Sequence, residues 1–136
     1  MKKVFVDTAA WLALINDKDY FHNSAVRIRK ELKSQGYYFV TSDFVFLEVA
    51  DALNNPKFRK NAIMFINRFK TLSDLLVIPV SDTLFQLGWQ LYCQRLDKDW
   101  GLTDCISFVI MQRENITEAF TTDKHFEQAG FIRLLT

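Results

Sequence analysis

The sequence has only 2 cysteines, 4 glycines and 2 prolines in 136 residues. Two cysteines cannot build a disulfide scaffold, and the lack of a Cys-x-x-Cys pair argues against a structural zinc site. So few glycines and prolines exclude collagen-like and low-complexity chains. No apolar run approaches the roughly 20 residues of a membrane span, and no small-residue cleavage site follows the first residues. We therefore expect a cytoplasmic protein with reduced cysteines and no membrane contact.

The charge balance is nearly neutral. Lysine and arginine total 17 against 16 acidic residues, so the formal net charge is +1. This excludes a globally basic nucleic-acid-binding protein but allows a local basic face. Hydrophobic residues make up 49% of the chain and aromatic residues 15%, which is enough to fill one core. Residues 1–136 are therefore predicted to form a single domain.

Short apolar runs alternate with stretches of helical periodicity. The first run, Val4 to Val6, is typical of a strand buried on both faces. Further strands are predicted at 37–40, 75–78, 119–121 and 131–134, and helices at 9–15, 21–35, 43–53, 57–72, 82–96, 104–115 and 123–129. This alternation predicts an α/β sandwich in which helices flank a mostly parallel sheet.

The expected helix ends follow from capping chemistry. Thr8, Ser42, Ser81 and Thr103 each stand just before a predicted helix, where a hydroxyl group can accept hydrogen bonds from free backbone N–H groups. Gly36 stands where the glycine after a helix commonly adopts a positive φ. We interpret Ser42 and Thr103 as caps rather than as nucleophiles.

Two acidic residues follow predicted strands. Asp7 comes directly after the first strand, and Asp123 follows the fourth. Ligand sites in open parallel sheets form at the carboxyl ends of the strands, so both side chains are candidates for one site. The alternative is that each aspartate only caps the helix that comes next.

Two more acidic residues begin or interrupt apolar helices. Glu48 shares a helix side with Phe44, Val45 and Ala52, so it is expected to emerge from apolar surroundings. Asp104 precedes a run that is apolar on most sides, from Cys105 to Met111. A first-turn aspartate is also favoured by the helix dipole, which would account for Asp104 without any function.

The four acids together favour a functional site. Carboxylates gathered at one sheet edge raise each other's pKa by repulsion, and no lysine or arginine stands beside all four. No histidine is expected at metal-ligand spacing with them. A divalent cation would relieve the repulsion, and all-oxygen ligation suits Mg²⁺ or Mn²⁺.

Four segments carry a resemblance to a known family: Val4-Phe5-Val6-Asp7-Thr8, Glu48 in its helix, Leu102-Thr103-Asp104-Cys105-Ile106-Ser107-Phe108, and Thr121-Thr122-Asp123-Lys124-His125-Phe126 followed by Ala129-Gly130-Phe131. With them the whole chain resembles the PIN-domain nucleases, and among these the VapC-type toxins of type II toxin–antitoxin pairs. The resemblance implies a PIN-like three-layer sandwich. It implies that Asp7 and Asp104 bind the metal directly, that Glu48 and Asp123 complete the cluster partly through water, and that Thr8 and Thr122 support it.

The resemblance also implies an activity. A Mg²⁺- or Mn²⁺-dependent ribonuclease of this family cleaves RNA phosphodiester bonds with a metal-activated water and leaves a 5′-phosphate. A VapC-type toxin further implies a small antitoxin protein and a homodimer. Two alternatives stay open: a PIN ribonuclease that works in RNA processing without an antitoxin, and a noncatalytic RNA-binding PIN module, which would be expected to lack one or more of the acids.

Two other classes that use acids in small α/β domains are unlike this sequence. A response-regulator receiver needs an acid pair after its first strand and an aspartate after its third, but here the third strand is followed by Pro79. A phosphatase of the haloacid dehalogenase type needs a second aspartate two residues after the first, and Ala9 occupies that position.

The remaining polar and aromatic residues are assigned more ordinary roles. Asp97 and Asp99 are interpreted as solvated loop acids, with a position facing the pocket as the alternative for either. His125 is interpreted as part of a turn, with a contact to the site as the alternative. Trp100 is the best candidate for an exposed aromatic residue. A stretch without acids between Lys57 and Ser73, and the basic residues from Arg27 to Lys33, form solvated helix faces, some of which are expected to line a route for RNA to the acids.

Overall fold

The computed structural model describes residues 2–136 and contains a five-stranded sheet in the order β3-β2-β1-β4-β5. Every pair of neighbouring strands is parallel. The strands are β1 (Lys3–Val6), β2 (Tyr38–Ser42), β3 (Leu75–Ile78), β4 (Glu118–Phe120) and β5 (Ile132–Arg133). The predicted strands are confirmed, with ends that shift by one or two residues.

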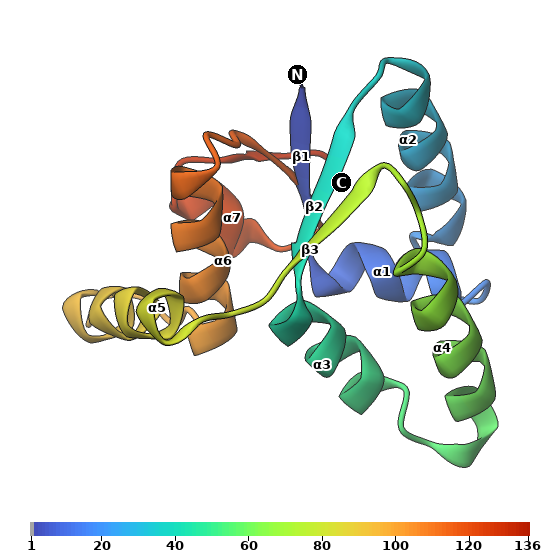
Figure 1. Ribbon diagram of the computed structural model, residues 1–136, viewed down its shortest axis with the longest axis horizontal. Helices are drawn as coiled ribbons and strands as arrows, with labels where there is room; N and C mark the ends of the chain where they lie inside the picture. Colours follow the sequence, from blue (N-terminus) through green and yellow to red (C-terminus); the bar gives the residue numbers. More distant parts are fainter. Residues whose placement is uncertain (1) are drawn as a thin grey trace.

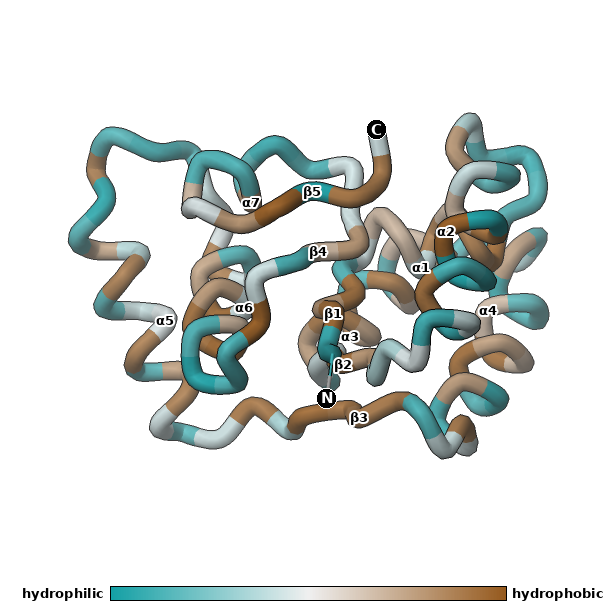
Figure 2. Tube along the Cα trace, turned by 90° about the horizontal axis from the view of Figure 1, so that it is seen from above, coloured by the Kyte–Doolittle hydropathy of each residue, from teal (hydrophilic) through white to brown (hydrophobic). Residues whose placement is uncertain are grey.

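Helices cover both faces of this sheet. They are α1 (Thr8–Ile15), α2 (His22–Ser34), α3 (Asp43–Ala52), α4 (Pro56–Phe69), α5 (Asp82–Gln94), α6 (Leu102–Arg113) and α7 (Lys124–Gln128). Figure 1 shows α1, α2 and α4 on one side of the strands and α5, α6 and α7 on the other, and the view in Figure 2 agrees. The predicted three-layer α/β sandwich is therefore confirmed.

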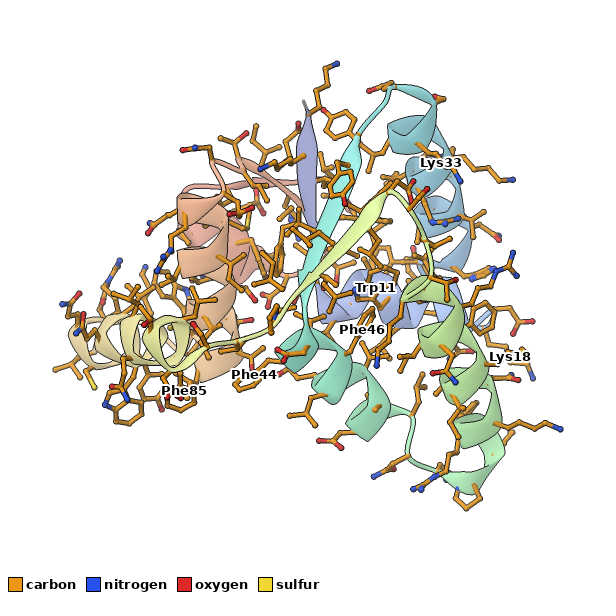
Figure 3. All side chains as sticks on the ribbon, in the orientation of Figure 1. Trp11, Lys18, Lys33, Phe44, Phe46 and Phe85 are labelled. Carbon is orange, nitrogen blue, oxygen red and sulfur yellow. The ribbon has the colours of Figure 1, made fainter. Side chains whose placement is uncertain are left out.

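The core lies where the sequence is most apolar. Val4, Phe5 and Val6 of β1 are almost fully buried, because this central strand is covered on both faces. Residues 105–111 of α6 are all buried as well, which confirms that this helix is interior. On the other side, Trp11 of α1 packs against Phe46 of α3 with a ring separation of 5.2 Å (Figure 3).

Some of the predicted caps are present and others are not. The Ser42 hydroxyl accepts a hydrogen bond from the Val45 N–H at 3.2 Å, and Ser81 caps α5 in the same way. Gly36 has a φ of +78° just after α2, as expected for a glycine in that position. The prediction for Thr103 was wrong, because α6 begins at Leu102 and Thr103 lies inside its first turn.

The prediction for Thr8 as a cap was also wrong. The helix α1 begins at Thr8 itself, and Asp7 occupies the capping position without a side-chain hydrogen bond to the helix. The Thr8 hydroxyl instead donates to Glu48 at 2.7 Å. Asp7 is thus free of capping and its carboxylate is available for other contacts.

The sheet order brings the ends of distant strands together. Because β1 pairs with β4 in the register Phe5 to Ala119 and Val6 to Phe120, the residues that follow, Asp7 and Thr121, come opposite each other. The carboxyl end of β2 lies on the other side of β1 and leads directly into α3. In the part of the chain that the structure describes, none of the helices has both the length and the apolar character that crossing a bilayer requires.

Candidate active site

Asp7 lies at the centre of the carboxyl edge of the sheet and is only 5% exposed. Its Oδ2 accepts a hydrogen bond from the Thr121 hydroxyl at 2.8 Å. The pKa of Asp7 is raised to about 7, chiefly by burial; hydrogen bonds from Thr121 and the Thr8 backbone oppose this rise, and the charges of Asp104 and Asp123 add to it. A carboxylate in this position is costly to ionise without a nearby positive charge.

Asp104 enters the site from the first turn of α6. Its Oδ2 accepts a hydrogen bond from the Gly101 backbone N–H at 3.3 Å. Burial and the charge of Asp123 raise its pKa, and hydrogen bonds from His125 and Gly101 oppose that rise. A favourable interaction with the helix dipole accounts for an aspartate in the first turn of α6. It does not explain why Asp104 also lies beside Asp123 and His125.

Asp123 comes from the loop after β4. Its Oδ1 accepts a hydrogen bond from the His125 backbone N–H at 2.9 Å, so it does cap α7. The same oxygen lies 3.3 Å from His125 Nδ1. The alternative that Asp123 caps the next helix is therefore correct, and the same carboxylate also belongs to the acidic cluster.

The fourth predicted acid, Glu48 of α3, contacts Thr8 at the start of α1. The prediction that it emerges from an apolar stripe was wrong, because Glu48 and Ala52 are both exposed. The exposed side chain reaches the N-terminus of α1, where its Oε1 accepts the hydrogen bond from Thr8. Thr8 directly follows Asp7, so this hydrogen bond connects Glu48 to the residue next to Asp7. A place for Glu48 among the acids that hold the metal stays a prediction.

His125 contacts three carboxylates, so the structure supports the alternative of a contact with the site over the preferred interpretation as a turn residue. Its Nδ1 lies 3.2 Å from Asp104 Oδ2, and its Nε2 lies 3.1 Å from Asp99 Oδ1. Burial alone would lower the pKa of His125, but its contacts with Asp104, Asp123 and Asp99 raise it above the usual value. The expectation that no histidine stands at ligand spacing was wrong, since His125 and Asp104 are 21 positions apart in sequence and only the fold joins them.

The two acids in the loop before α6, Asp97 and Asp99, have different partners. Asp97 forms an ion pair with Arg95 at 2.9 Å and remains a loop acid, as predicted. Asp99 is 87% exposed, yet its carboxylate faces His125. Figure 2 shows this largely hydrophilic loop between α5 and α6 passing close to α7, where His125 lies.

Sequence reasoning missed Thr121. The hydroxyl group that binds Asp7 belongs to Thr121, which is fully buried and also accepts a hydrogen bond from the Asp123 N–H at 3.0 Å. The Thr122 carbonyl oxygen accepts a hydrogen bond from Arg133 at 2.8 Å. The pairing register of β1 and β4 is the signal that places Thr121 opposite Asp7, and it is not readable from local sequence.

The exposed aromatic residues are not those predicted. Trp100 is 6% exposed, and its indole N–H donates to Gln128 at 2.9 Å. The exposed rings include Tyr20, which is 91% exposed, and Trp89 and Tyr92 of α5, which stack with a centroid separation of 5.4 Å. The predicted basic faces lie on α2 and α4, across the sheet from α6 and α7 (Figure 1), so a basic route to the acids stays a prediction.

The donor atoms suit a divalent cation. One ligand atom each from Asp104, Asp123 and His125 lies within 4.8 Å of the others. Asp7 adds a buried carboxylate whose ionisation needs a compensating charge. Among residues 2–136, these three aspartates form no ion pair with a lysine or arginine. The residues therefore fit a cation held between strand ends and the start of α6.

This sandwich with an acidic carboxyl edge defines the class of protein. The chain belongs to the PIN domain family, whose model matches residues 4–132. It is 28% identical over 132 residues to the 23S rRNA-specific endonuclease VapC20 of Mycobacterium tuberculosis. The alignment covers 96% of this chain and 97% of that protein.

Solved structures agree with this assignment. The crystal structure of M. tuberculosis VapC20, described as a Sarcin-Ricin loop cleaving toxin, superposes with a TM-score of 0.85 at 26% identity and covers 98% of this chain and 99% of that one. VapBC2 of Rickettsia felis, solved with a promoter DNA fragment, gives a TM-score of 0.73 at 18% identity with 96% of both chains covered. FitAcB of Neisseria gonorrhoeae gives 0.66 at 14% identity, also with 96% of both chains covered. The last two show the shared fold.

Proposed function

We propose that this PIN-domain protein is a metal-dependent RNA endonuclease and the toxin of a toxin–antitoxin pair. The observation that carries the proposal is the meeting of Asp7, Asp104 and Asp123 at one edge of the sheet, where the charges of Asp104 and Asp123 both act on the pKa of Asp7. The similarity to an RNA endonuclease over nearly the whole chain supports the substrate class.

The proposed roles follow from the contacts of each side chain. Asp7, Asp104 and Asp123 hold Mg²⁺ or Mn²⁺, and Glu48 completes the acidic edge from the side of α3. The Thr121 hydroxyl orients Asp7, and the Thr8 hydroxyl orients Glu48. Thr122 remains a predicted supporting residue.

A bound divalent cation supplies Lewis acidity, which lowers the pKa of water and stabilises the leaving oxygen of a phosphodiester. The carboxylates of the chain contribute by holding the positive charge of the cation close to the reacting phosphate, so that no side-chain nucleophile is needed. Ser42 is unsuited to attack, because its hydroxyl group is fully buried and accepts the Val45 N–H. As the resemblance to PIN nucleases implies, one product is expected to carry a 5′-phosphate.

The proposed partners are an antitoxin protein and a second copy of the chain. A toxin that cleaves RNA of its own host needs a neutralising protein, and the similar VapC20 structure is described as a toxin. The stacked, half-exposed rings of Trp89 and Tyr92 provide apolar surface of the kind found in protein interfaces. An RNA substrate would place this activity in the cytoplasm.

Removal of divalent cations is expected to stop RNA cleavage. EDTA should reduce cleavage of a labelled RNA hairpin to background, and excess Mg²⁺ or Mn²⁺ should restore it, because the crowded carboxylates need a cation to work together. Gel analysis of the products measures this directly. Cleavage that persists in EDTA would argue for chemistry without a metal.

Induction of the protein in a bacterial host is expected to arrest growth if it is a toxin. The arrest should disappear with Asp7→Asn, which keeps the size and the Thr121 hydrogen bond but removes the charge. Sequencing of RNA 5′ ends after brief induction identifies the target. Equal arrest by both forms would remove nuclease activity as its cause.

The second candidate is a PIN ribonuclease that acts in RNA processing without an antitoxin. It predicts the same cleavage in vitro but no growth arrest, and no short open reading frame for an antitoxin upstream of the gene. A noncatalytic binding module is less consistent with the structure, since the chain retains all four acids and three of them converge.

A further inference from the structure

The imidazole of His125 is enclosed by carboxylates from three different segments. Its Nδ1 lies 3.2 Å from Asp104 Oδ2 and 3.3 Å from Asp123 Oδ1, and its Nε2 lies 3.1 Å from Asp99 Oδ1. Asp104 lies in the first turn of α6, Asp123 follows β4, and Asp99 belongs to the loop after α5. A surface histidine in a simple turn has no reason to meet all three.

We propose that His125 is a nitrogen ligand of the divalent cation, through Nδ1, and that it makes the site prefer Mn²⁺ to Mg²⁺. This inference rests on the metal-dependent nuclease function proposed above. It changes the all-oxygen ligand set expected from the sequence into a mixed set of oxygen and nitrogen atoms.

The spacing of the donor atoms supports a shared ion. Two adjacent ligand atoms at about 2.1 Å from an octahedral ion lie about 3.0 Å apart, and two opposite ones lie about 4.2 Å apart. His125 Nδ1 lies 3.2 and 3.3 Å from the two aspartate oxygens. All three atoms therefore need only small shifts to bind one ion.

The contact with Asp99 supports the orientation of the ring. Metal-binding histidines usually donate their second ring N–H to a carboxylate or carbonyl, which fixes the ring and makes the first nitrogen a better ligand. Asp99 occupies this position at Nε2. When the ion binds at Nδ1, it takes the place of the proton that Nδ1 would otherwise share with Asp104 and Asp123.

The nitrogen donor sets the metal preference. Mg²⁺ demands hard oxygen ligands and retains several waters, whereas imidazole suits transition metals better. A site of aspartates alone would accept both ions. A histidine in the ligand set therefore raises the affinity for Mn²⁺ relative to Mg²⁺.

Pulsed electron paramagnetic resonance of the full chain loaded with Mn²⁺ tests the proposal without measuring activity. We expect nitrogen modulation whose frequencies change when histidine is labelled with ¹⁵N. The chain has 2 histidines, and His22 lies elsewhere, with its Nδ1 2.7 Å from the Ala13 carbonyl oxygen. The modulation should persist in His22→Gln and disappear in His125→Gln.

Binding titrations give a second readout. The affinity for Mn²⁺ should fall on the order of tenfold or more in His125→Gln, and the affinity for Mg²⁺ should fall less. Asp99→Asn should weaken Mn²⁺ binding about tenfold.

The contrary results separate this inference from the proposed function. Mn²⁺ bound to the unaltered protein without histidine nitrogen modulation would overturn the inference, because His125 would then only hydrogen-bond to the acids, while the nuclease proposal would stand. An equal loss of Mn²⁺ and Mg²⁺ affinity in His125→Gln would also overturn it. A protein that binds neither ion would contradict the metal-dependent function itself.

Discussion

Asp104→Asn is expected to abolish RNA cleavage while leaving the fold intact. The carboxylate lies at the start of a buried helix and its pKa is raised by burial and by Asp123, so it is placed to hold positive charge. Loss of one ligand that contributes several kcal/mol to charge stabilisation lowers the rate by on the order of 1,000-fold. The measurement is kcat/KM on a fluorescent RNA hairpin.

The matched control for this variant is Asp97→Asn. Asp97 is also an aspartate close to the start of α6, but it pairs with Arg95 at 2.9 Å instead of entering the cluster. This control should cleave at close to the normal rate. Asp104→Asn with normal cleavage and normal circular dichroism would show that Asp104 has only a capping role.

Asp7→Asn is expected to make the protein more stable in the absence of divalent cations, although it removes activity. Burial raises the pKa of Asp7 from 3.8 to about 7. The folded state thus binds more protons than the unfolded state between about pH 4 and pH 7, and the free energy of unfolding falls as the pH rises through that range. A shift of this size corresponds to about 4 kcal/mol.

Thermal unfolding in EDTA at pH 8 and at pH 4 measures this effect. At pH 8 the Asp7→Asn variant should melt several degrees higher than the unaltered protein, and at pH 4 the difference should shrink, because Asp7 is then protonated in the folded state. Asp104→Asn should give a smaller gain at pH 8, since Asp104 is less buried than Asp7. Destabilisation of Asp7→Asn at pH 8 would contradict the assignment of Asp7 as a strained, buried acid.

Much of the fold was predictable because its signals are local. Val4 to Val6 is apolar at every position, as a strand covered on both faces must be, and β3 has the predicted bounds. The residues from Cys105 to Met111 are buried, in agreement with their composition. The rule that parallel strands present ligand sites at their carboxyl ends placed Asp7 and Asp123 on one edge without any coordinates.

The details that escaped prediction depend on register and on tertiary contacts. Thr121 meets Asp7 only because β1 and β4 pair in one particular register. His125 reaches Asp104 only because α7 packs beside α6. Trp100 stands in a polar loop, yet it is buried, with its ring edge-to-face against Phe108 and its indole N–H donating to Gln128. Local composition carries no information on such pairs.

The central claim is that carboxylates far apart in the sequence form one cation site. Calorimetric titration of Mn²⁺ into the unaltered protein, Asp7→Asn, Asp104→Asn and Asp97→Asn tests it most directly. The account predicts a binding event in the unaltered protein and in Asp97→Asn that is lost or greatly weakened in both of the other variants. Undiminished Mn²⁺ binding in either Asp7→Asn or Asp104→Asn would contradict it.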